Sequence, residues 1–306
     1  MKQPSFLKAK QTIGITCPAG YMLAEKAADC IKTLQKWGFE VMVGKTLGSA
    51  SSNYFSGTDE ERRDELQAML DDVNIHAIIF GRGGYGMGRI INQLDFKKFK
   101  KNPKWLVGFS DITVLHNHLQ ANNKVCSIHG PMAAAFTLTD GDSRAIDSLH
   151  QVLKGKRNTY RCSPSPYNRT GKSTGRLVGG NLTLMVNSIG TAQQINTRNK
   201  ILILEENGEQ LYHIDRMFYQ LKGSGLLKDL AGLVIGGFTD VKDTERPFGE
   251  EVESLIRKIV DEYKYPVCFH FPVSHGKENV ALKIGGVYQL SVSNKQTVLK
   301  EIADIT

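Results

Sequence analysis

A serine at position 110 follows a short apolar run and precedes a segment with helical spacing. The apolar run, Trp105–Val107, is typical of a buried strand and breaks at Gly108. Between Asp111 and Gln120 the apolar residues recur on one face of a helix. The pattern predicts that Ser110 lies on a tight strand-to-helix turn, where its hydroxyl could attack a substrate and helix N–H groups could stabilise an oxyanion. The position also suits a serine that only caps the helix.

The segment Gly81-Arg-Gly-Gly-Tyr-Gly86 follows another predicted strand and precedes a helix. It matches the dinucleotide-binding pattern G-x-G-x-x-G. Such a site also needs an acidic residue about 20 positions on, whereas the next predicted strand ends about 30 positions on, at Ser110-Asp111. Two alternatives to a dinucleotide site are a plain flexible turn and a turn whose glycines let backbone N–H groups approach a substrate oxygen. The last interpretation fits best.

A carboxylate pair and a loop histidine supply further chemistry. Glu205-Glu206 follow the apolar run Ile201–Leu204, and parallel α/β sheets place functional groups at such strand ends. A serine nucleophile needs a neutral imidazole to take its proton, and that imidazole needs a carboxylate to fix its tautomer. Ser110, His275 and Glu205 could supply these three parts. The alternatives are a solvated strand end for Glu205 and a surface histidine for His275.

No metal site is expected from the histidines or cysteines. His116 and His118 are two positions apart on a predicted helix and point in different directions. The five cysteines are scattered, odd in number and without a C-x-x-C pair, which predicts free thiols in a reducing compartment. They are Cys17, Cys30, Cys126, Cys162 and Cys268.

The composition is that of a soluble globular protein, with 41% hydrophobic and 23% charged residues in a chain of 306. No apolar run approaches the roughly 20 residues that span a bilayer. The N-terminus has no apolar signal region, so we expect no secretory signal and no membrane partner. The net charge of +8 favours an anionic substrate. Apart from the run 97–101 the lysines are dispersed, and no nucleic-acid motif accompanies them, so we expect no nucleic-acid partner.

The first half of the chain alternates predicted strands and helices, which indicates a parallel sheet with helices on both faces. The strands are expected at 12–16, 40–43, 77–80 and 105–107, and the helices at 24–37 and 59–72. We therefore predict an N-terminal α/β domain over residues 1–155. The polar, turn-rich segment 156–173 is predicted to be a linker.

Residues 174–306 are predicted to form a second domain. It is expected to contain a loop entering a helix at 179–185, buried strands at 201–204 and 233–235, an amphipathic helix at 250–262, and antiparallel strands within 281–290 and 296–302.

Five motifs occur in a fixed order along the chain: Arg82-Gly-Gly-Tyr-Gly86, Gly108-Phe-Ser-Asp111, Gly179-Gly-Asn-Leu182, Leu204-Glu-Glu206 with Tyr212-His-Ile-Asp-Arg216, and Ser274-His-Gly276. Together they resemble the LD-carboxypeptidase family of serine peptidases, which includes murein tetrapeptide carboxypeptidases and microcin C self-immunity peptidases. The resemblance extends from Ile13 to about Gly286. It implies an α/β N-terminal domain with a parallel sheet, joined to a smaller C-terminal α/β domain with a β-rich core.

The resemblance also assigns roles to residues. It places the nucleophile at Ser110, the acid of the triad at Glu205 and the base at His275. The oxyanion hole maps onto the backbone N–H of Asp111 and one from the Arg82-Gly83-Gly84 turn. The family more often has Glu-Asp at the acidic strand end; strand register favours Glu205 over Glu206. Arg82, beside the turn, is a candidate to bind a substrate carboxylate, or else forms a structural salt bridge.

The implied activity is hydrolysis of the bond between an L-centre and a C-terminal D-alanine in cytoplasmic peptidoglycan fragments. The expected substrate is a murein tetrapeptide processed in peptidoglycan recycling. The expected enzyme is a cytoplasmic homodimer with no metal and no cofactor.

Three alternatives stay open. A microcin-type peptidase that cleaves aminoacyl-nucleotide amides needs an aromatic surface, and residues 236–249 offer only Phe238 and Phe248. A nucleotide-binding protein would use Gly81–Gly86. The third alternative is a binding module without catalytic activity. The presence of all three residues of a triad argues against it.

Overall fold

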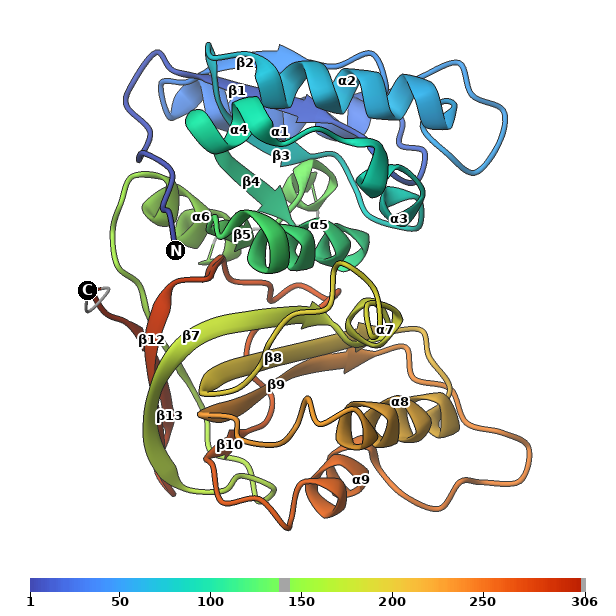
Figure 1. Cartoon of the computed structure of the whole chain (residues 1–306), viewed down its shortest axis with the longest axis vertical. Coiled ribbons are helices and arrows are strands. Elements are labelled where there is room, and N and C mark those ends of the chain that lie inside the picture. The colour runs from blue at the N-terminus through green and yellow to red at the C-terminus, as the bar shows by residue number, and fades with distance from the viewer. Residues whose placement is uncertain (138–143, 304–306) are drawn as a thin grey trace. The chain divides into compact units, whose positions relative to one another are not determined.

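The computed structural model describes residues 1–137 and 144–303, which form two compact units. Unit 1 comprises residues 1–156 and 280–283, and unit 2 comprises residues 157–279 and 284–306. Both are α/β structures, as predicted, and Figure 1 labels their elements.

Unit 1 is built on a six-stranded sheet with the order β11-β5-β4-β3-β1-β2. The pairs β2–β1, β1–β3, β3–β4 and β4–β5 are all parallel. The strands are β1 (Thr12–Thr16), β2 (Glu40–Val43), β3 (Ile75–Phe80), β4 (Trp105–Gly108), β5 (Ser127–His129) and β11 (Leu282–Ile284). The parallel sheet expected for the first half of the chain is confirmed.

Helices cover both faces of this sheet, because alternate strand residues enter two different cores. Ile79 and Trp105 pack with α1 and α6, whereas Ile78 and Leu106 pack with α2, α3 and α5. The α-helices are α1 (Ala28–Lys36), α2 (Asp59–Asp71), α3 (Met87–Ile90), α4 (Lys97–Lys101), α5 (Thr113–His118) and α6 (Arg144–Leu153). Short 3₁₀ helices are η1 (Ala24–Ala27), η2 (Ile91–Gln93), η3 (Ser110–Ile112) and η5 (Ala133–Thr137), and η4 (Leu119–Asn123) is a short π-helix.

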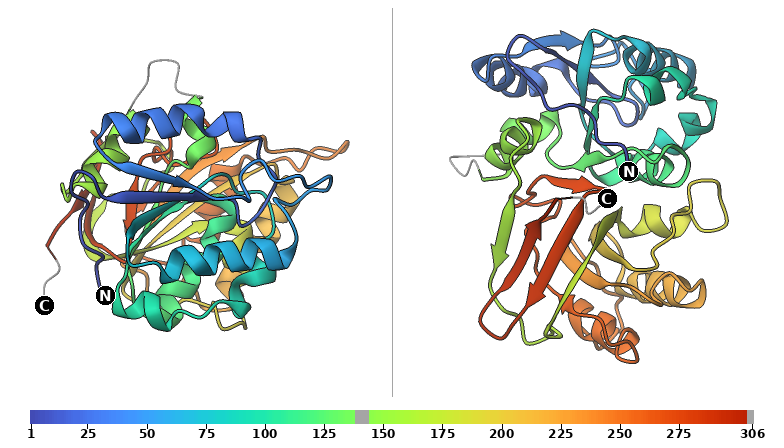
Figure 2. Two further views of the ribbon diagram at one scale, coloured as in Figure 1. Left: turned by 90° about the horizontal axis from the view of Figure 1, so that it is seen from above. Right: turned by 60° about the vertical axis from the view of Figure 1, so that its left-hand side comes forward.

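Unit 2 contains a seven-stranded mixed sheet with the order β10-β9-β8-β7-β12-β13-β6. Strands β7 to β10 are parallel. Beyond β7, each of the next three strands runs antiparallel to its neighbour: β12 to β7, β13 to β12, and β6 to β13. β12 and β13 are the adjacent red arrows in the right view of Figure 2. The strands are β6 (Thr159–Cys162), β7 (Gly171–Asn181), β8 (Lys200–Asn207), β9 (Gly232–Thr239), β10 (Val267–Cys268), β12 (Val287–Val292) and β13 (Thr297–Glu301).

Three helices pack on one face of the parallel part of this sheet. They are α7 (Leu182–Asn187), α8 (Leu211–Gly223) and α9 (Val252–Ile259). Their apolar sides share a core with residues of β8 and β9 such as Leu204 and Ile235. This core supports the C-terminal end of β8, where the predicted carboxylate pair lies.

Three segments differ from the sequence-based expectation. The expected linker 156–173 contains β6, whose four residues are too few for a clear alternation, and the start of β7. Gly179 and Gly180, expected in a loop, lie within strand β7, which ends at Asn181. A Cβ atom at Gly179 would lie 2.1 Å from the carbonyl oxygen of Ile203, so the glycine permits close contact with β8. Residues 282–284, expected in an antiparallel set, form β11 in the sheet of unit 1.

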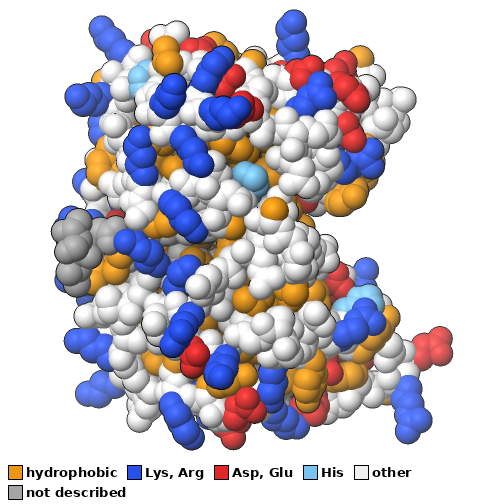
Figure 3. Space-filling model, in the orientation of Figure 1, with side chains coloured by type: hydrophobic (Ala, Val, Ile, Leu, Met, Phe, Trp, Pro, Cys, Tyr) orange, Lys and Arg blue, Asp and Glu red, His pale blue; other side chains and the backbone are white. Residues whose placement is uncertain are grey.

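On the face drawn in Figure 3, Lys and Arg side chains are most numerous on the left half, whereas Asp and Glu lie mainly at the upper right and near the lower edge. In residues 1–137 and 144–303, no helix combines the length and the apolar character that crossing a membrane requires.

Candidate active site

Ser110 lies at the C-terminal end of β4, where an extended Phe109 is followed by a left-handed residue. Phe109 has φ −151° and Ser110 has φ +59°. The left-handed region is unfavourable for a serine and is typically tolerated where function requires it. Ser110 is the first residue of η3, whose capping position is held by Phe109. The predicted strand-to-helix turn is present, and Ser110 does not occupy the capping position of this turn.

The glycine segment that follows β3 packs directly against this serine. A Cβ atom at Gly83 would stand 2.8 Å from Cβ and 2.9 Å from Oγ of Ser110. The same position is 3.4 Å from the backbone nitrogen of Asp111. Gly84, with φ +98°, adopts a conformation that few other residues tolerate. The lack of a side chain at Gly83 therefore lets the backbone of this segment lie next to the serine hydroxyl, within the same unit.

The side chain of Asp111 joins the serine turn to the end of the glycine segment. Its Oδ2 atom accepts a hydrogen bond of 2.7 Å from the backbone N–H of Met87, the first residue of α3. Burial raises the pKa of Asp111 to about 6, although N–H donors at Met87 and Gly86 and the charge of Arg62 oppose that shift. This carboxyl group thus fixes two neighbouring segments that supply the predicted oxyanion donors.

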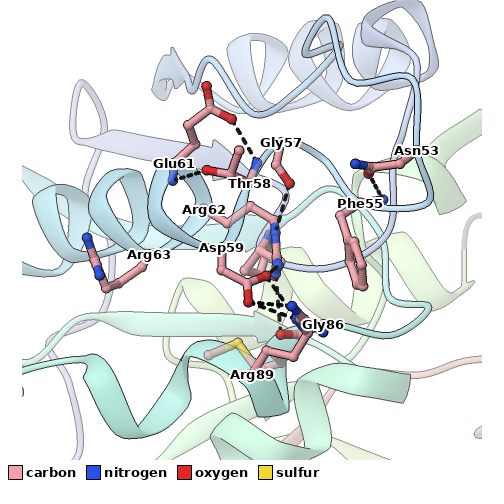
Figure 4. Close-up of polar contacts among 12 residues, drawn as sticks. Asn53, Phe55, Gly57, Thr58, Asp59, Glu61, Arg62, Arg63, Gly86 and Arg89 are labelled. Carbon is pink, nitrogen blue, oxygen red and sulfur yellow. Dashed lines mark hydrogen bonds and ion pairs between the residues drawn. The ribbon is translucent and has the colours of Figure 1, made fainter.

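A buried arginine holds the other side of the glycine segment (Figure 4). The guanidinium of Arg62 is fully buried, donates to the carbonyl oxygens of Gly57 and Gly86, and pairs with Asp59. Its Cζ atom lies 4.8 Å from the ring centre of Phe55. Asp59 also pairs with Arg89 at 2.8 Å. Sequence reasoning missed this cluster, because an Asp and an Arg three positions apart on a helix also describe a surface pair.

Arg82, the candidate for a substrate carboxylate, is exposed. Its Nη1 atom donates to the backbone carbonyl of Tyr21 at 2.9 Å. It makes no ion pair with any residue in the described ranges, so the alternative of a structural salt bridge finds no support.

In unit 2, His275 is hydrogen bonded to Glu205. The Nδ1 atom of His275 lies 2.7 Å from Oε2 of Glu205, whose side chain is fully buried while that of the histidine is 21% exposed. Burial lowers the pKa of His275, but the hydrogen bond and charge of Glu205 outweigh it, with smaller contributions from Glu206 and Asp240, so the net pKa is raised. A protonated ring is thus stabilised beside a buried carboxylate.

A glycine bulge in β9 makes room for this pair. The β8–β9 register runs from Leu204↔Ile235 to Glu206↔Phe238, so β9 has one extra residue opposite Glu205. A Cβ atom at Gly236 would lie 2.3 Å from the carbonyl oxygen of Val273 and 3.2 Å from Cβ of Glu205. The bulge therefore lets the segment that carries His275 pass close to Glu205. Sequence reasoning missed it, although the Gly-Gly pair directly after an apolar strand was a usable signal.

Glu206 has a different set of partners. It accepts hydrogen bonds from Nδ2 of Asn181 (2.8 Å) and from the backbone N–H groups of Thr183 (2.8 Å) and Asn207 (2.9 Å). Burial raises the pKa of Glu206, and these donors partly offset the shift. Asn181 in turn caps α7. Glu206 thus anchors the start of α7, while Glu205 contacts the histidine.

The structure shows no group of three or more potential metal-binding side chains among the residues it describes. His116, considered above as a ligand, is buried and bonds to the Gly108 carbonyl (2.9 Å) and to Ser127 (2.8 Å). Burial lowers its pKa to about 4, so it is a neutral residue that supports the end of β4.

Comparisons with known proteins match both units. The model for the LD-carboxypeptidase N-terminal domain matches residues 13–130, and that for the LD-carboxypeptidase C-terminal domain matches residues 174–290. The Bacillus subtilis protein named "Probable murein peptide carboxypeptidase" is 32% identical over 97% of this chain and 94% of its own length. The murein tetrapeptide carboxypeptidase of Pseudomonas aeruginosa is 28% identical over 89% of this chain and 91% of its own length.

Solved structures agree with these matches. The muramoyltetrapeptide carboxypeptidase of Oxalobacter formigenes superposes with a TM-score of 0.86 at 28% identity, covering 96% of this chain and all of the other (100%). The microcin C7 self-immunity protein has the same fold, with a TM-score of 0.86 at 22% identity and 98% coverage of both chains.

Proposed function

Because the chain belongs to the LD-carboxypeptidase family of peptidases, we propose that it is a serine carboxypeptidase that removes the C-terminal D-alanine from murein tetrapeptides. Ser110 is the nucleophile, His275 the general base and Glu205 its orienting carboxylate. The observation that carries the proposal is the 2.7 Å contact between Nδ1 of His275 and Oε2 of Glu205. A carboxylate on Nδ1 holds the tautomer in which Nε2 can accept a proton.

The reaction follows from these roles. Nε2 of His275 takes the proton of the Ser110 hydroxyl as Oγ attacks the carbonyl carbon before the D-alanine. The resulting imidazolium gives that proton to the amine of the departing D-alanine, which leaves an acyl-enzyme. A water molecule, deprotonated by the same imidazole, then releases the tripeptide and restores Ser110.

The oxyanion formed in each step is stabilised by backbone donors of unit 1. We assign the N–H of Asp111 and one N–H from Gly83 or Gly84 to this role. The close packing of Gly83 on Ser110 and the hydrogen bond from Met87 to Asp111 support it, because both hold these backbone segments beside the hydroxyl. Donors fixed in advance stabilise the developing charge without reorganisation.

We propose that Arg82 contributes to specificity for a terminal D-residue. Arg82 is exposed and close to the glycine turn, so it can bind the terminal carboxylate of the peptide. Inverting the last centre exchanges the methyl group and the carboxylate, which moves the scissile carbonyl away from Ser110 and the oxyanion donors.

We place the reaction in the cytoplasm, on peptidoglycan fragments that are recycled there, and expect a homodimer that uses no metal or cofactor.

The test is a comparison of three peptides by mass spectrometry. A murein tetrapeptide that ends in D-alanine should lose one residue, whereas the peptide ending in L-alanine and the C-terminally amidated peptide should stay intact. Ser110→Ala protein, confirmed as folded by circular dichroism, is the matched control and should leave all three unchanged. Equal cleavage of the L- and D-terminated peptides, or full activity on the amidated one, contradicts the assignment.

The alternative substrate class is included in the same experiment. The microcin C7 self-immunity protein of Escherichia coli is 23% identical over 96% of this chain and 94% of its own length. Faster cleavage of an aminoacyl-sulfamoyl-adenosine than of the tetrapeptide would replace the murein substrate by an aminoacyl nucleotide.

A further inference from the structure

Two cysteines from opposite edges of the sheet in unit 2 contact each other. Strands β10 and β6 are the two outermost strands of this seven-stranded sheet. Cys268 lies on β10 and Cys162 on β6, and their Sγ atoms are 3.8 Å apart although the residues are separated by 106 positions. Sequence spacing gave no sign of this pair.

Both cysteines lie on strands whose backbones are paired with neighbouring strands. Cys162 pairs with Thr297 of β13, and Cys268 pairs with Val234 of β9. The chain that leaves β6 then reaches β10, where Arg169 and Val267 exchange two backbone hydrogen bonds of 3.0 and 3.1 Å. Strand β7, visibly arched in Figure 1, shows the curvature that brings the two edges together. The contact is therefore fixed by regular strand pairing on each side.

The two thiols differ in their access to solvent. Cys162 is half-buried, whereas Cys268 is fully buried. Cys17, Cys30 and Cys126 are buried in the other unit. An oxidant from solvent therefore meets Cys162 before Cys268.

We propose that Cys162 and Cys268 form a reversible dithiol–disulfide site that responds to peroxides and, when oxidised, closes the sheet of unit 2 edge to edge. The Cys162 thiolate attacks one peroxide oxygen, which breaks the O–O bond and gives a sulfenic acid and hydroxide. Cys268 then loses its proton and attacks the sulfenic sulfur as a thiolate, which forms the S–S bond; the departing hydroxide takes up that proton and leaves as water. Two thiols and one hydrogen peroxide thus give one disulfide and two waters, with two electrons passing from sulfur to oxygen.

The surroundings predict how the rate depends on pH. Contact with Cys162, together with burial, raises the pKa of the Cys268 thiol well above its usual value. The resolving thiol is therefore protonated at neutral pH, and only the thiolate attacks efficiently. Closure should be slow near pH 7 and faster as the pH increases.

The disulfide would act on the fold and on the segment that bears His275. It encloses a long loop, between two residues 106 positions apart, and cross-links of this kind stabilise chiefly by restricting the unfolded chain. Strand β10 continues directly into residues 269–275, whose backbone is bonded to β9 through Phe271 and Val273. Oxidation would thus fix the start of this segment without touching Glu205 or His275.

The experiment uses the full chain treated with hydrogen peroxide and then with an alkylating reagent. Before alkylation, the intact mass of the peroxide-treated protein should be about 2 Da below that of the reduced protein, and dithiothreitol should reverse the loss. Alkylation then blocks the remaining thiols before digestion. A tryptic map should contain one peptide pair joined through Cys162 and Cys268. The oxidised protein should melt about 5 °C or more above the reduced protein.

Variants separate this disulfide from other oxidation. Cys162→Ser and Cys268→Ser should each abolish both the mass loss and the rise in melting temperature, whereas Cys126→Ser should keep both. A wild-type map that shows Cys162 only as a sulfinic acid, or joined to any other cysteine, overturns the proposal. So does an oxidised wild-type protein with the Cys162–Cys268 link and an unchanged melting temperature, because closure of the sheet would then have no effect.

Discussion

A methyl group on Gly237 would stand 2.6 Å from the Cβ atom of Ser274, the residue directly before His275. The N–H of Gly237 also donates to the carbonyl of Val273 at 2.8 Å. The glycine bulge of β9 and the histidine segment are therefore in direct backbone contact, and any side chain at residue 237 must displace that segment.

The first prediction follows from this contact. Gly237→Ala should move His275 relative to Glu205 and reduce kcat by about 100-fold, the effect expected of a misplacement of about 1 Å. The matched control is Gly223→Ala at the end of α8, where an added Cβ atom meets nothing within 4 Å. Steady-state kinetics on the tetrapeptide should separate the two variants. Equal activity of both would show that the close contact at residue 237 does not position the base.

The second prediction concerns pH. The general base must be neutral, and Glu205 raises the pKa of His275 above its ordinary value of 6.5. Activity should therefore increase with pH through that raised pKa, so kcat/KM measured from pH 5 to 9 should show an acid limb centred above 6.5. In Glu205→Gln protein the limb should move to lower pH, because the stabilising charge is gone. An unmoved limb would assign it to another group.

The hydrogen-bonded pair of His275 and Glu205 also affects stability. Its stabilising effect decreases as pH rises, whereas activity increases. Its contribution to the free energy of unfolding is complete below the unfolded-state pKa of about 6.5 and decreases as pH rises through the raised folded-state pKa. Urea titrations of wild type and Glu205→Gln at pH 5.5 and 9 should show the larger difference at pH 5.5.

The third prediction uses the left-handed backbone of Ser110. Both Ser110→Ala and Ser110→Gly should lose turnover, since neither has a nucleophile. Glycine adopts φ +59° without the steric cost that alanine has there, so Ser110→Gly should be more stable than Ser110→Ala by about 1 kcal/mol. Urea denaturation measures the difference. Identical midpoints would mean that residue 110 stores no backbone strain.

The fourth prediction separates the two neighbouring glutamates. Glu205→Gln should lower kcat by about 10⁴-fold, as loss of an orienting carboxylate does, and leave the fold intact. Glu206→Gln should keep most of the activity but lower the free energy of unfolding by about 1–3 kcal/mol, because a charged acceptor of three hydrogen bonds is lost. A reversed pattern would make Glu206 the partner of the base.

Local patterns predicted the local features of this protein. The strand at Trp105–Val107 and the turn at Ser110 depend on residues that are neighbours in the sequence, so periodicity was sufficient. The expected break at Gly108 was wrong, because the strand continues through this residue. Which glutamate contacts His275 depends on the register of the strand before them. The sequence favoured Glu205 over Glu206, and the structure was needed to show the contact.

Long-range pairings were not predictable in this way. A three-residue strand such as Leu282–Ile284 carries no signal of which sheet it joins, so the prediction placed it in the wrong set of strands. The contact between Cys162 and Cys268 arises from the curvature of a whole sheet. The Asp59–Arg62 pair looked like an ordinary surface pair, because burial of a helix face depends on what packs against it.

The position of β11 in the chain determines when unit 1 can be completed during synthesis. Residues 280–283 belong to unit 1, where the N–H of Ala281 donates to Ser148 at 2.8 Å, yet they follow almost all of unit 2 in the sequence. Until they leave the ribosome, β5 is an unprotected edge strand, a structure prone to pairing with other chains. The sheet that carries Ser110 is thus finished among the last parts of the protein, and any chain truncated before residue 280 lacks β11, one of the two edge strands of that sheet.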